Sequence, residues 1–181
     1  MKRNELIRWG QAVAAALGWM LFRLAGKGLP AAAFACLETG LAAGLMALYA
    51  REKGREVFRF SGKAVLFGAA AAAAAGVLAR FCFGRPEGDA SLWLFLSRCG
   101  AGPLAEETLY RGLVYDRVAR EKRPWLAAGV SALLFAAAHG SLPRMAAAFA
   151  AGLLLGAGRK KTGTVTVPAV MHMILNILQW T

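Results

Sequence analysis

The chain has few acidic residues, few cysteines and few histidines. Its 181 residues include 10 Asp and Glu, 3 Cys and 2 His. Cys36, Cys82 and Cys99 form no Cys-x-x-Cys pair, which argues against a zinc knuckle and against a dithiol redox motif. Their odd number gives no support to a disulfide framework. Charged residues make up 18% of the chain, against about 25% in typical soluble domains, and this shortage disfavours a soluble enzyme.

Apolar and basic residues are abundant instead. Hydrophobic residues make up 58% of the chain, which excludes a disordered protein. Lys and Arg outnumber Asp and Glu by 22 to 10, for a net charge of +12. Such an excess favours either nucleic acid or a membrane surface as partner. Because the basic residues lie between long apolar segments and do not interleave with aromatics, we expect contact with a lipid bilayer and no nucleic acid.

Long apolar segments separated by short charged stretches dominate the chain. Strand-like alternation is absent, and runs rich in Ala, Leu and Gly favour helices, which leave no unpaired backbone in lipid. We therefore expect an all-α polytopic membrane bundle of about seven transmembrane helices, forming a single integral membrane domain over residues 1–181. The predicted segments lie at about residues 9–22, 31–50, 64–83, 92–115, 125–139, 144–158 and 165–180.

The lengths and boundaries of these segments carry further information. A spanning helix needs about 20 apolar residues, and only 31–50 and 64–83 reach that length. The shorter segments would need snorkelling Lys and Arg, or shielding by longer neighbours. Proline favours the first turn of a helix, and five prolines stand at or just inside the beginning of a segment. These prolines are Pro30, Pro103, Pro124, Pro143 and Pro168.

The distribution of basic residues predicts the orientation in the membrane. Assigning successive groups to alternating sides places 16 Lys and Arg on the N-terminal side and 6 on the other side. By the positive-inside rule we expect a cytoplasmic N-terminus, in what we take to be a bacterial plasma membrane. Two small-residue pairs, Gly40–Gly44 and Gly152–Gly156, are expected to allow close packing of helices within the chain or between chains.

A few polar residues stand inside apolar segments, where they are costly to bury and therefore point to function. Both histidines of the chain belong to this set. Its members are Glu106, Glu107 and Arg111 in the fourth segment, His139 at the end of the fifth, and His172 and Asn176 in the seventh.

The spacing of these residues places them on helix faces. Glu107 and Arg111 stand four residues apart with the acid first, the better order for a helical ion pair. Glu106 lies about 100° further round the helix, so this pair does not use its carboxylate. His172 and Asn176 are also four residues apart and share one face. Three helices can therefore direct two carboxylates, two imidazoles and a carboxamide to one cavity.

Three motifs follow one another along the chain. They are Glu-Glu-x-x-x-Arg at 106–111, Phe-x-x-x-His at 135–139 and His-x-x-x-Asn at 172–176. Together they closely resemble the CPBP family, the CAAX proteases and bacteriocin-processing enzymes, also called the Abi family of intramembrane proteases. The resemblance covers about residues 92–181, the motif-bearing core of the chain.

The resemblance implies an intramembrane endopeptidase that hydrolyses a peptide bond near the membrane surface. Peptide hydrolysis needs an activated water and a site for the developing oxyanion. By the resemblance, Glu106 and His139 activate the water. His172 and Asn176 then bind the oxyanion. The substrate would be a peptide or protein at the membrane, such as a prenylated C-terminal tail, a bacteriocin leader or another small membrane protein.

Other acidic and aromatic residues of these segments are expected to have supporting roles. By the resemblance, Glu107 and Arg111 hold the helix and the electric field around Glu106. We interpret Glu38 as a packed or interfacial residue. Tyr110 and Phe135 are interpreted as cavity walls.

Cofactor use and two other function classes stay open. Zinc held by Glu106, His139 and His172 is one possibility, but no His-Glu-x-x-His occurs and we favour catalysis without a metal. A non-catalytic immunity or scaffolding protein could use the same helices. A small transporter could use the same buried groups, although it would favour internal repeats, and the two halves show none.

Overall fold

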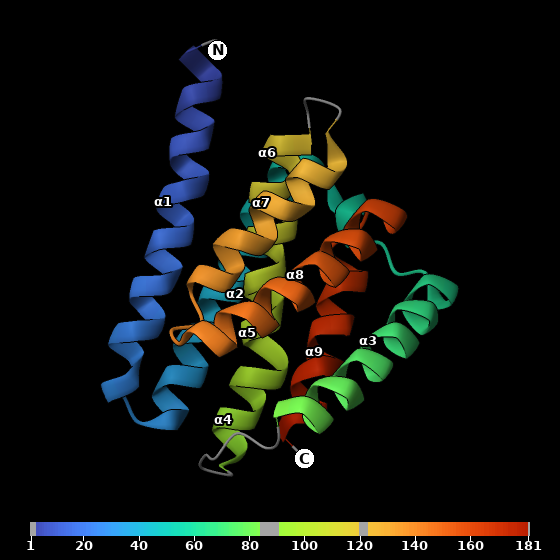
Figure 1. Cartoon of the computed structure of the whole chain (residues 1–181). Coiled ribbons are helices and arrows are strands. Elements are labelled where there is room, and N and C mark those ends of the chain that lie inside the picture. Colours follow the sequence, from blue (N-terminus) through green and yellow to red (C-terminus); the bar gives the residue numbers. More distant parts are fainter. Residues whose placement is uncertain (1–2, 84–90, 120–122, 181) are drawn as a thin grey trace.

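The computed structural model describes residues 3–83, 91–119 and 123–180, which are helical apart from short connections (Figure 1). No strand occurs within these ranges, as the all-α prediction requires. The long helices are α1 Arg3–Ala25, α2 Ala31–Lys53, α3 Gly62–Phe83, α7 Pro124–Ala137, α8 Leu142–Thr162 and α9 Thr166–Trp180. Short 3-10 turns, η1 Gly26–Gly28 and η2 Arg55–Phe58, follow α1 and α2.

A single continuous helix over residues 92–119 contains two π-helical stretches. Its parts are α4 Leu92–Leu96, π stretch η3 Ser97–Ala101, α5 Gly102–Glu107, π stretch η4 Thr108–Val114 and α6 Tyr115–Ala119.

Pro103 explains the first π stretch and corrects one expectation. It is the second residue of α5 and lies inside the continuous helix, so it does not start a predicted segment. Proline has no N–H and its ring crowds the preceding turn. The Gly102 N–H bonds to the Ser97 carbonyl five residues back, and a Cβ at Gly102 would lie 2.8 Å from that oxygen. Glycine is therefore needed next to the proline.

Each predicted apolar segment corresponds to one helical rod, but seven membrane crossings are not established. Among the described helices, two are long and apolar enough to cross a membrane, α2 and the Gly62–Phe81 part of α3. Two shorter apolar helices lie at Pro124–Ala137 and Thr166–Gln179. A seven-helix crossing therefore stays a prediction. Of the cysteines, Cys36 and Cys99 are free thiols, and the Cys82 side chain lies outside the described part.

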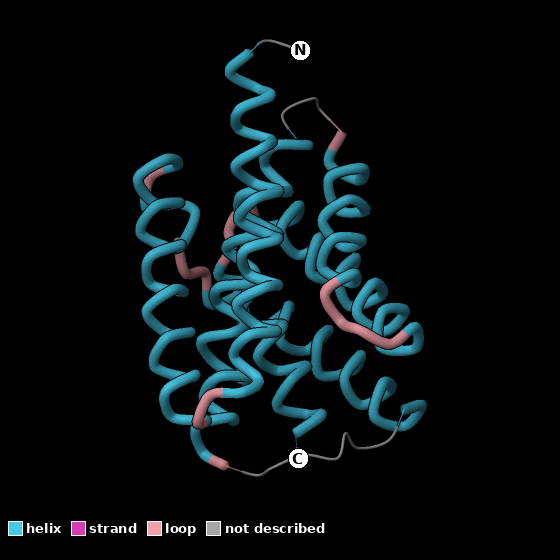
Figure 2. Tube along the Cα trace, turned by 90° about the vertical axis from the view of Figure 1, so that its left-hand side faces the viewer, coloured by secondary structure: helices cyan, strands magenta, loops and turns pink. Residues whose placement is uncertain are grey.

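The helix over residues 92–119 runs through the middle of the bundle (Figures 1 and 2). Helices α1 and α2 pack along one side of it, and α9 packs on another. Helix α3 lies outermost against α9, and α7 packs lengthwise on α8. The largest fully buried side chains include Leu109, Tyr110 and Arg111. The centre of the fold is thus the segment that carries the first motif.

The outer face of α3 is strongly apolar and exposed. Leu66, Phe67 and Phe81 expose 72%, 63% and 90% of their surface. Contiguous apolar faces of this kind are rare on soluble monomers, and the hydrocarbon layer of a bilayer would cover them.

A second cluster of hydrogen bonds and ion pairs surrounds Arg159. It shows that two of the counted basic residues are buried. Arg159 is only 7% exposed. Its Nη2 donates to Asp116 at 2.8 Å, and its Nε donates to the Arg111 carbonyl at 2.9 Å. The Tyr49 hydroxyl donates to Asp116 at 2.8 Å. Arg159 and Arg111 were both included in the Lys and Arg count that predicts the orientation, but both are buried in ion pairs and are therefore not free surface charges.

The two glycine pairs behave differently. Gly152 and Gly156 face α7, where a Cβ would lie 2.8 Å from Ala132 Cβ and 2.9 Å from Ala128 Cβ. This confirms close packing for the second pair. A Cβ at Gly40 or Gly44 would meet no atom within 4 Å, so the first pair makes no close contact with other parts of the chain that the structure describes.

Replacing Gly156 by alanine is expected to destabilise the contact between α7 and α8. The new Cβ would lie 2.9 Å from Ala128 Cβ and 3.2 Å from its Cα, so the two helices must move apart. Overpacking of this kind costs about 1–3 kcal/mol. The measurement is the Tm of the purified protein in detergent, which should fall.

Gly44→Ala is the matched control for this prediction. A Cβ there meets nothing, and alanine inside a helix is favoured over glycine by about 1 kcal/mol. Its Tm should be unchanged or higher. A Tm of Gly156→Ala at or above that of the wild type would contradict the close approach of the two helices.

Candidate active site

Glu107 lies at the centre of the site and is completely buried. Arg111 Nη1 donates to its Oε1 at 2.8 Å, which forms the ion pair that the spacing predicts. The same oxygen lies 2.9 Å from His172 Nδ1. Because an ionised carboxylate can only accept, this ring nitrogen is the donor. The contact with His172 joins α9 to α5 and was not predicted.

Arg111 extends this connection to two more helices. Its Nη2 donates to the Gly152 carbonyl on α8 at 3.0 Å. Its guanidinium carbon lies 4.7 Å from the ring centroid of Phe135 on α7. The side chain is fully buried, yet Arg111 Nε and Glu107 Oε2 have no hydrogen-bond partner among the described residues. Burying this pair is costly, so its geometry constrains four helices at once.

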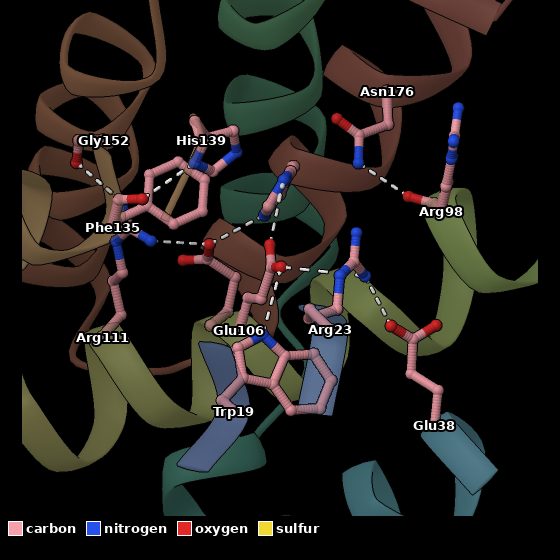
Figure 3. A network of polar contacts seen from close by, with 12 residues as sticks. Trp19, Arg23, Glu38, Arg98, Glu106, Arg111, Phe135, His139, Gly152 and Asn176 are labelled. Carbon is pink, nitrogen blue, oxygen red and sulfur yellow. Dashed lines mark hydrogen bonds and ion pairs between the residues drawn. The ribbon is translucent and has the colours of Figure 1, made fainter. Parts of the chain in front are cut away.

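Glu106 points to a different environment from its neighbour. The Trp19 Nε1 donates to Glu106 Oε1 at 3.3 Å, and Arg23 Nη1 lies 4.0 Å from the same oxygen (Figure 3). The other oxygen, Oε2, lies 3.8 Å from His172 Nε2. Its side chain is 12% exposed, so this carboxylate reaches a cavity while Glu107 does not. The rotation of about 100° between adjacent helical residues produces this difference.

His139 lies two residues after the end of α7 and is oriented by the last turn of that helix. Its Nδ1 lies 2.8 Å from the Phe135 carbonyl oxygen. Since a carbonyl only accepts, Nδ1 carries the hydrogen, and Nε2 is left to accept from water or substrate. The Phe135 ring packs 4.6 Å from the His139 ring and 5.4 Å from the His172 ring, measured between centroids. Tyr110 packs edge-on behind Phe135 and is 1% exposed; Phe135 lines the smaller of the two cavities described below, and Tyr110 lines neither of these two.

Asn176 lies one turn after His172 on α9. Its Nδ2 donates to the Arg98 carbonyl of η3 at 2.7 Å (Figure 3). The carboxamide is therefore oriented by the π stretch that Pro103 follows. A carboxamide nitrogen has two hydrogens, so one N–H of Asn176 is not used by this bond.

Two neighbouring cavities meet at the site, in place of the single cavity that the sequence predicts. A cavity of about 650 Å³ is lined by Glu106, His139 and Arg23, among others. A second cavity of about 450 Å³ is lined by His139, His172 and Asn176, with apolar side chains of α3 and α8. His139 and Arg144 line both. The predicted catalytic residues are thus brought together around His139, although Glu106 and Asn176 line different cavities.

The donor groups can be tested against the zinc alternative. A catalytic zinc site needs three side-chain ligands and one open position. Among residues 3–83, 91–119 and 123–180, no three His, Cys, Asp or Glu side chains are close enough together to hold a metal ion. His172 is bound to Glu107 through Nδ1, and its Nε2 is 3.8 Å from Glu106. The chemistry proposed below uses the side chains of Glu106, His139 and His172 without a metal, and the chelator experiment described with it tests the zinc alternative.

Three residues of the first two helices lie at the site, and two of them, Trp19 and Arg23, were not predicted as site residues. Trp19 and Arg23 contact Glu106 from α1. Glu38 on α2 is completely buried and pairs with Arg23 at 2.5 Å. The prediction that Glu38 is a packed residue is confirmed, whereas Arg23 entered the sequence analysis only as one of the Lys and Arg residues counted for the orientation. One signal was available, because a carboxylate inside an apolar helix requires a cation nearby.

Comparison with known proteins identifies the family. The family model described as type II CAAX prenyl endopeptidase Rce1-like matches residues 88–178, half of the chain. The chain belongs to the Rce1-like family. This confirms the resemblance to the CAAX proteases on which the three motifs were interpreted. The Rce1-like range contains all three motifs, whereas Trp19, Arg23 and Glu38 precede it.

A protein of undetermined function is also similar to this Rce1-like chain. It is an uncharacterized 24.3 kDa protein of Escherichia coli, 38% identical over 77 residues. The alignment covers 39% of this chain and 35% of that protein, so the chain matches about a third of its relative's length. No solved structure matches the chain.

Replacing Arg111 by alanine is expected to reduce the yield of folded protein. The change leaves Glu107 as a buried charge with one partner fewer and frees the Gly152 carbonyl. Removing one member of a buried ion pair costs about 3–5 kcal/mol. The yield is measured as the monodisperse fraction in detergent.

The double variant Arg111→Ala/Glu107→Gln is the control. It removes the uncompensated charge, so part of the yield should return. Full yield of Arg111→Ala without activity would contradict a structural role and would make Arg111 a catalytic residue.

Proposed function

We propose that this Rce1-like protein is an intramembrane endopeptidase that hydrolyses a peptide bond near the membrane surface. The observation that carries the proposal is the position of Glu106. Its carboxylate lines the larger cavity together with His139, and its Oε2 lies 3.8 Å from His172 Nε2. A separation of this size is too long for a direct hydrogen bond and suits one bridging water.

The proposed chemistry begins with this water. Glu106 accepts a proton from the water while the oxygen attacks the carbonyl carbon of the peptide bond. His139 Nε2, which its own backbone bond leaves available, orients the water from the other side of the cavity. Glu106 then passes the proton to the leaving nitrogen as the C–N bond breaks. Each proton is thus returned, and the carboxylate is regenerated.

The oxyanion would be held by the residues of α9. The N–H of Asn176 that is not bonded to Arg98 can donate to the carbonyl oxygen as negative charge develops on it. His172, oriented by Glu107 through Nδ1, is proposed as the second donor at this oxygen, a role that requires a hydrogen on Nε2 as well as on Nδ1. The bond between Asn176 and the Arg98 carbonyl orients the carboxamide in advance, so little reorganisation is needed in the transition state.

The substrate class follows from the smaller cavity. It opens between α3, α8 and α9 and is lined mostly by alanine and leucine side chains. An apolar portion of a membrane-bound peptide would fit there while the peptide bond reaches His139. A prenylated C-terminal tail, a bacteriocin leader and a segment of a small membrane protein all satisfy this requirement, and a peptide panel distinguishes them.

We propose the membrane orientation on the remaining surface charges. Arg111 and Arg159 are buried in ion pairs, and Arg23 faces Glu38 and Glu106. Removing these three from the Lys and Arg count still leaves a large excess on the N-terminal side. The proposal is an integral protein of a bacterial plasma membrane with a cytoplasmic N-terminus.

Glu106→Gln and His139→Ala are each expected to abolish peptide cleavage while leaving the folded protein intact. The glutamine keeps the shape of Glu106 but cannot accept the proton from water. The alanine removes the imidazole from the junction of the two cavities. Cleavage is measured with purified protein in detergent against the peptide panel, and folding by Tm.

Two outcomes contradict the proposal. Normal cleavage by either variant removes the base assignment, and no cleavage of any peptide by the wild type favours a non-catalytic scaffolding or immunity role. The same assay is run with a chelator. Unchanged cleavage agrees with catalysis by the protein's own residues, whereas loss that added Zn²⁺ restores would show a metal enzyme.

Asn176→Ala is expected to lower kcat by about 10²–10³ with a small change in KM, because it removes a donor to the oxyanion. The Asn176→Asp variant, similar in size but lacking both N–H groups, should be at least as impaired. An unchanged kcat in Asn176→Ala would assign this residue to helix packing through the Arg98 carbonyl alone.

A further inference from the structure

Two residues of α1 that precede the family-matched range, Trp19 and Arg23, reach the carboxylate of Glu106, and Glu38 of α2 pairs with Arg23 (Figure 3). We propose that Trp19 and Arg23 are positioning residues that hold Glu106 Oε1 and leave Oε2 as the basic oxygen. Glu38 holds Arg23 in turn. This inference rests on the proposed function, since it assumes that Glu106 activates the water.

Trp19 is placed as a fixed donor. It is 5% exposed and lies in the main apolar core, with its ring centroid 5.6 Å from that of Phe22. An indole has one N–H and no acceptor, so a buried tryptophan needs an acceptor in front of its nitrogen. That acceptor is Glu106 Oε1, at 3.3 Å. The core therefore determines where this oxygen lies.

Arg23 lies between two carboxylates. Its Nη1 is 2.5 Å from Glu38 Oε1 and 4.0 Å from Glu106 Oε1. Glu38 is completely buried, and its second oxygen accepts a hydrogen bond from the Ser97 hydroxyl. Both Glu38 oxygens are therefore satisfied, which directs the guanidinium towards Glu106. The connection runs from η3 through α2 and α1 to the site.

The two oxygens of Glu106 thus have different surroundings. Oε1 faces Trp19 and the positive charge of Arg23. Oε2 faces His172 Nε2 at 3.8 Å, the separation that one water can bridge. A carboxylate whose outer oxygen is already bound cannot rotate freely, so Oε2 is presented to the water in one orientation. Such preorganisation raises kcat without adding a contact to the substrate.

A simpler role for the same residues makes a different prediction. The Arg23–Glu38 pair could serve only to attach α1 to α2, and Trp19 could serve only to fill the core. Removing the indole N–H while keeping an aromatic ring would then leave kcat unchanged. Removing both charges of the pair would also leave kcat unchanged in the molecules that fold.

The first test is Trp19→Phe, with Trp93→Phe as the matched control. Trp93 lies on α4 with 46% of its surface exposed, and it lines neither cavity. With a substrate identified from the peptide panel, we expect kcat to fall about three- to tenfold in Trp19→Phe, as the loss of one hydrogen bond predicts, while KM stays the same. Trp93→Phe should match the wild type. An unchanged kcat in Trp19→Phe, or a raised KM alone, overturns the positioning role of Trp19.

The second test compares Glu38→Gln with Arg23→Gln/Glu38→Gln. The single variant removes one partner of Arg23 but keeps the Arg23 charge beside Glu106, so its kcat is the reference for the effect of that charge. The double variant removes both charges of the Arg23–Glu38 pair, so we expect it to fold. Its kcat should be at least about tenfold lower than that of Glu38→Gln. Arg23→Lys should restore most of the activity. Equal kcat values per folded molecule in the single and double variants overturn the role of Arg23.

Failure of this inference differs from failure of the proposed function. Cleavage by the wild type that is lost in Glu106→Gln but unchanged in Trp19→Phe and in the double variant overturns the positioning network alone. Cleavage that Glu106→Gln retains, or that the wild type lacks, overturns both.

Discussion

The buried carboxylate of Glu107 is the constraint on which the rest of the site depends. A charge at zero exposure is tolerated only when partners surround it. Arg111 and His172 both bind its Oε1, from the same helix and from α9. Arg111 then binds the α8 backbone through Gly152 and packs on Phe135 of α7. Placing one carboxylate in the core therefore determines the relative positions of all three motifs.

The neighbouring carboxylates of Glu106 and Glu107 face different surroundings because a helix turns by about 100° per residue. Glu107 faces the core, where Arg111 and His172 bind it, whereas Glu106 faces a cavity and is available for the proposed chemistry. The two π stretches on either side of α5 set this face. π-helical turns often mark functional sites, and here η3 supplies the Arg98 carbonyl that orients Asn176. Pro103 thus connects the π-helical geometry of η3 with the orientation of Asn176.

Much of the fold and of the site could be predicted because the signals are local. Long apolar runs predict the helical rods, and the Glu107–Arg111 pair follows from helical spacing alone. The contact between His172 and Glu107 crosses 65 positions of sequence, and no spacing rule predicts it. The count of basic residues along the chain was inaccurate for a related reason. A count along the chain treats Arg159 as a surface charge, although Asp116 and Tyr49 surround it in the fold.

The sequence by itself determined the all-helical class, the approximate limits of the helices, the family and the residues available for chemistry. These properties depend on composition and on contacts within a turn or two of helix. Tertiary structure alone decided that two cavities meet at His139, that Trp19 and Arg23 reach Glu106 from outside the family-matched half, and that Glu38 pairs with Arg23. The physical reason is that a buried charge finds its partner in space, and helix packing brings that partner from any part of the chain.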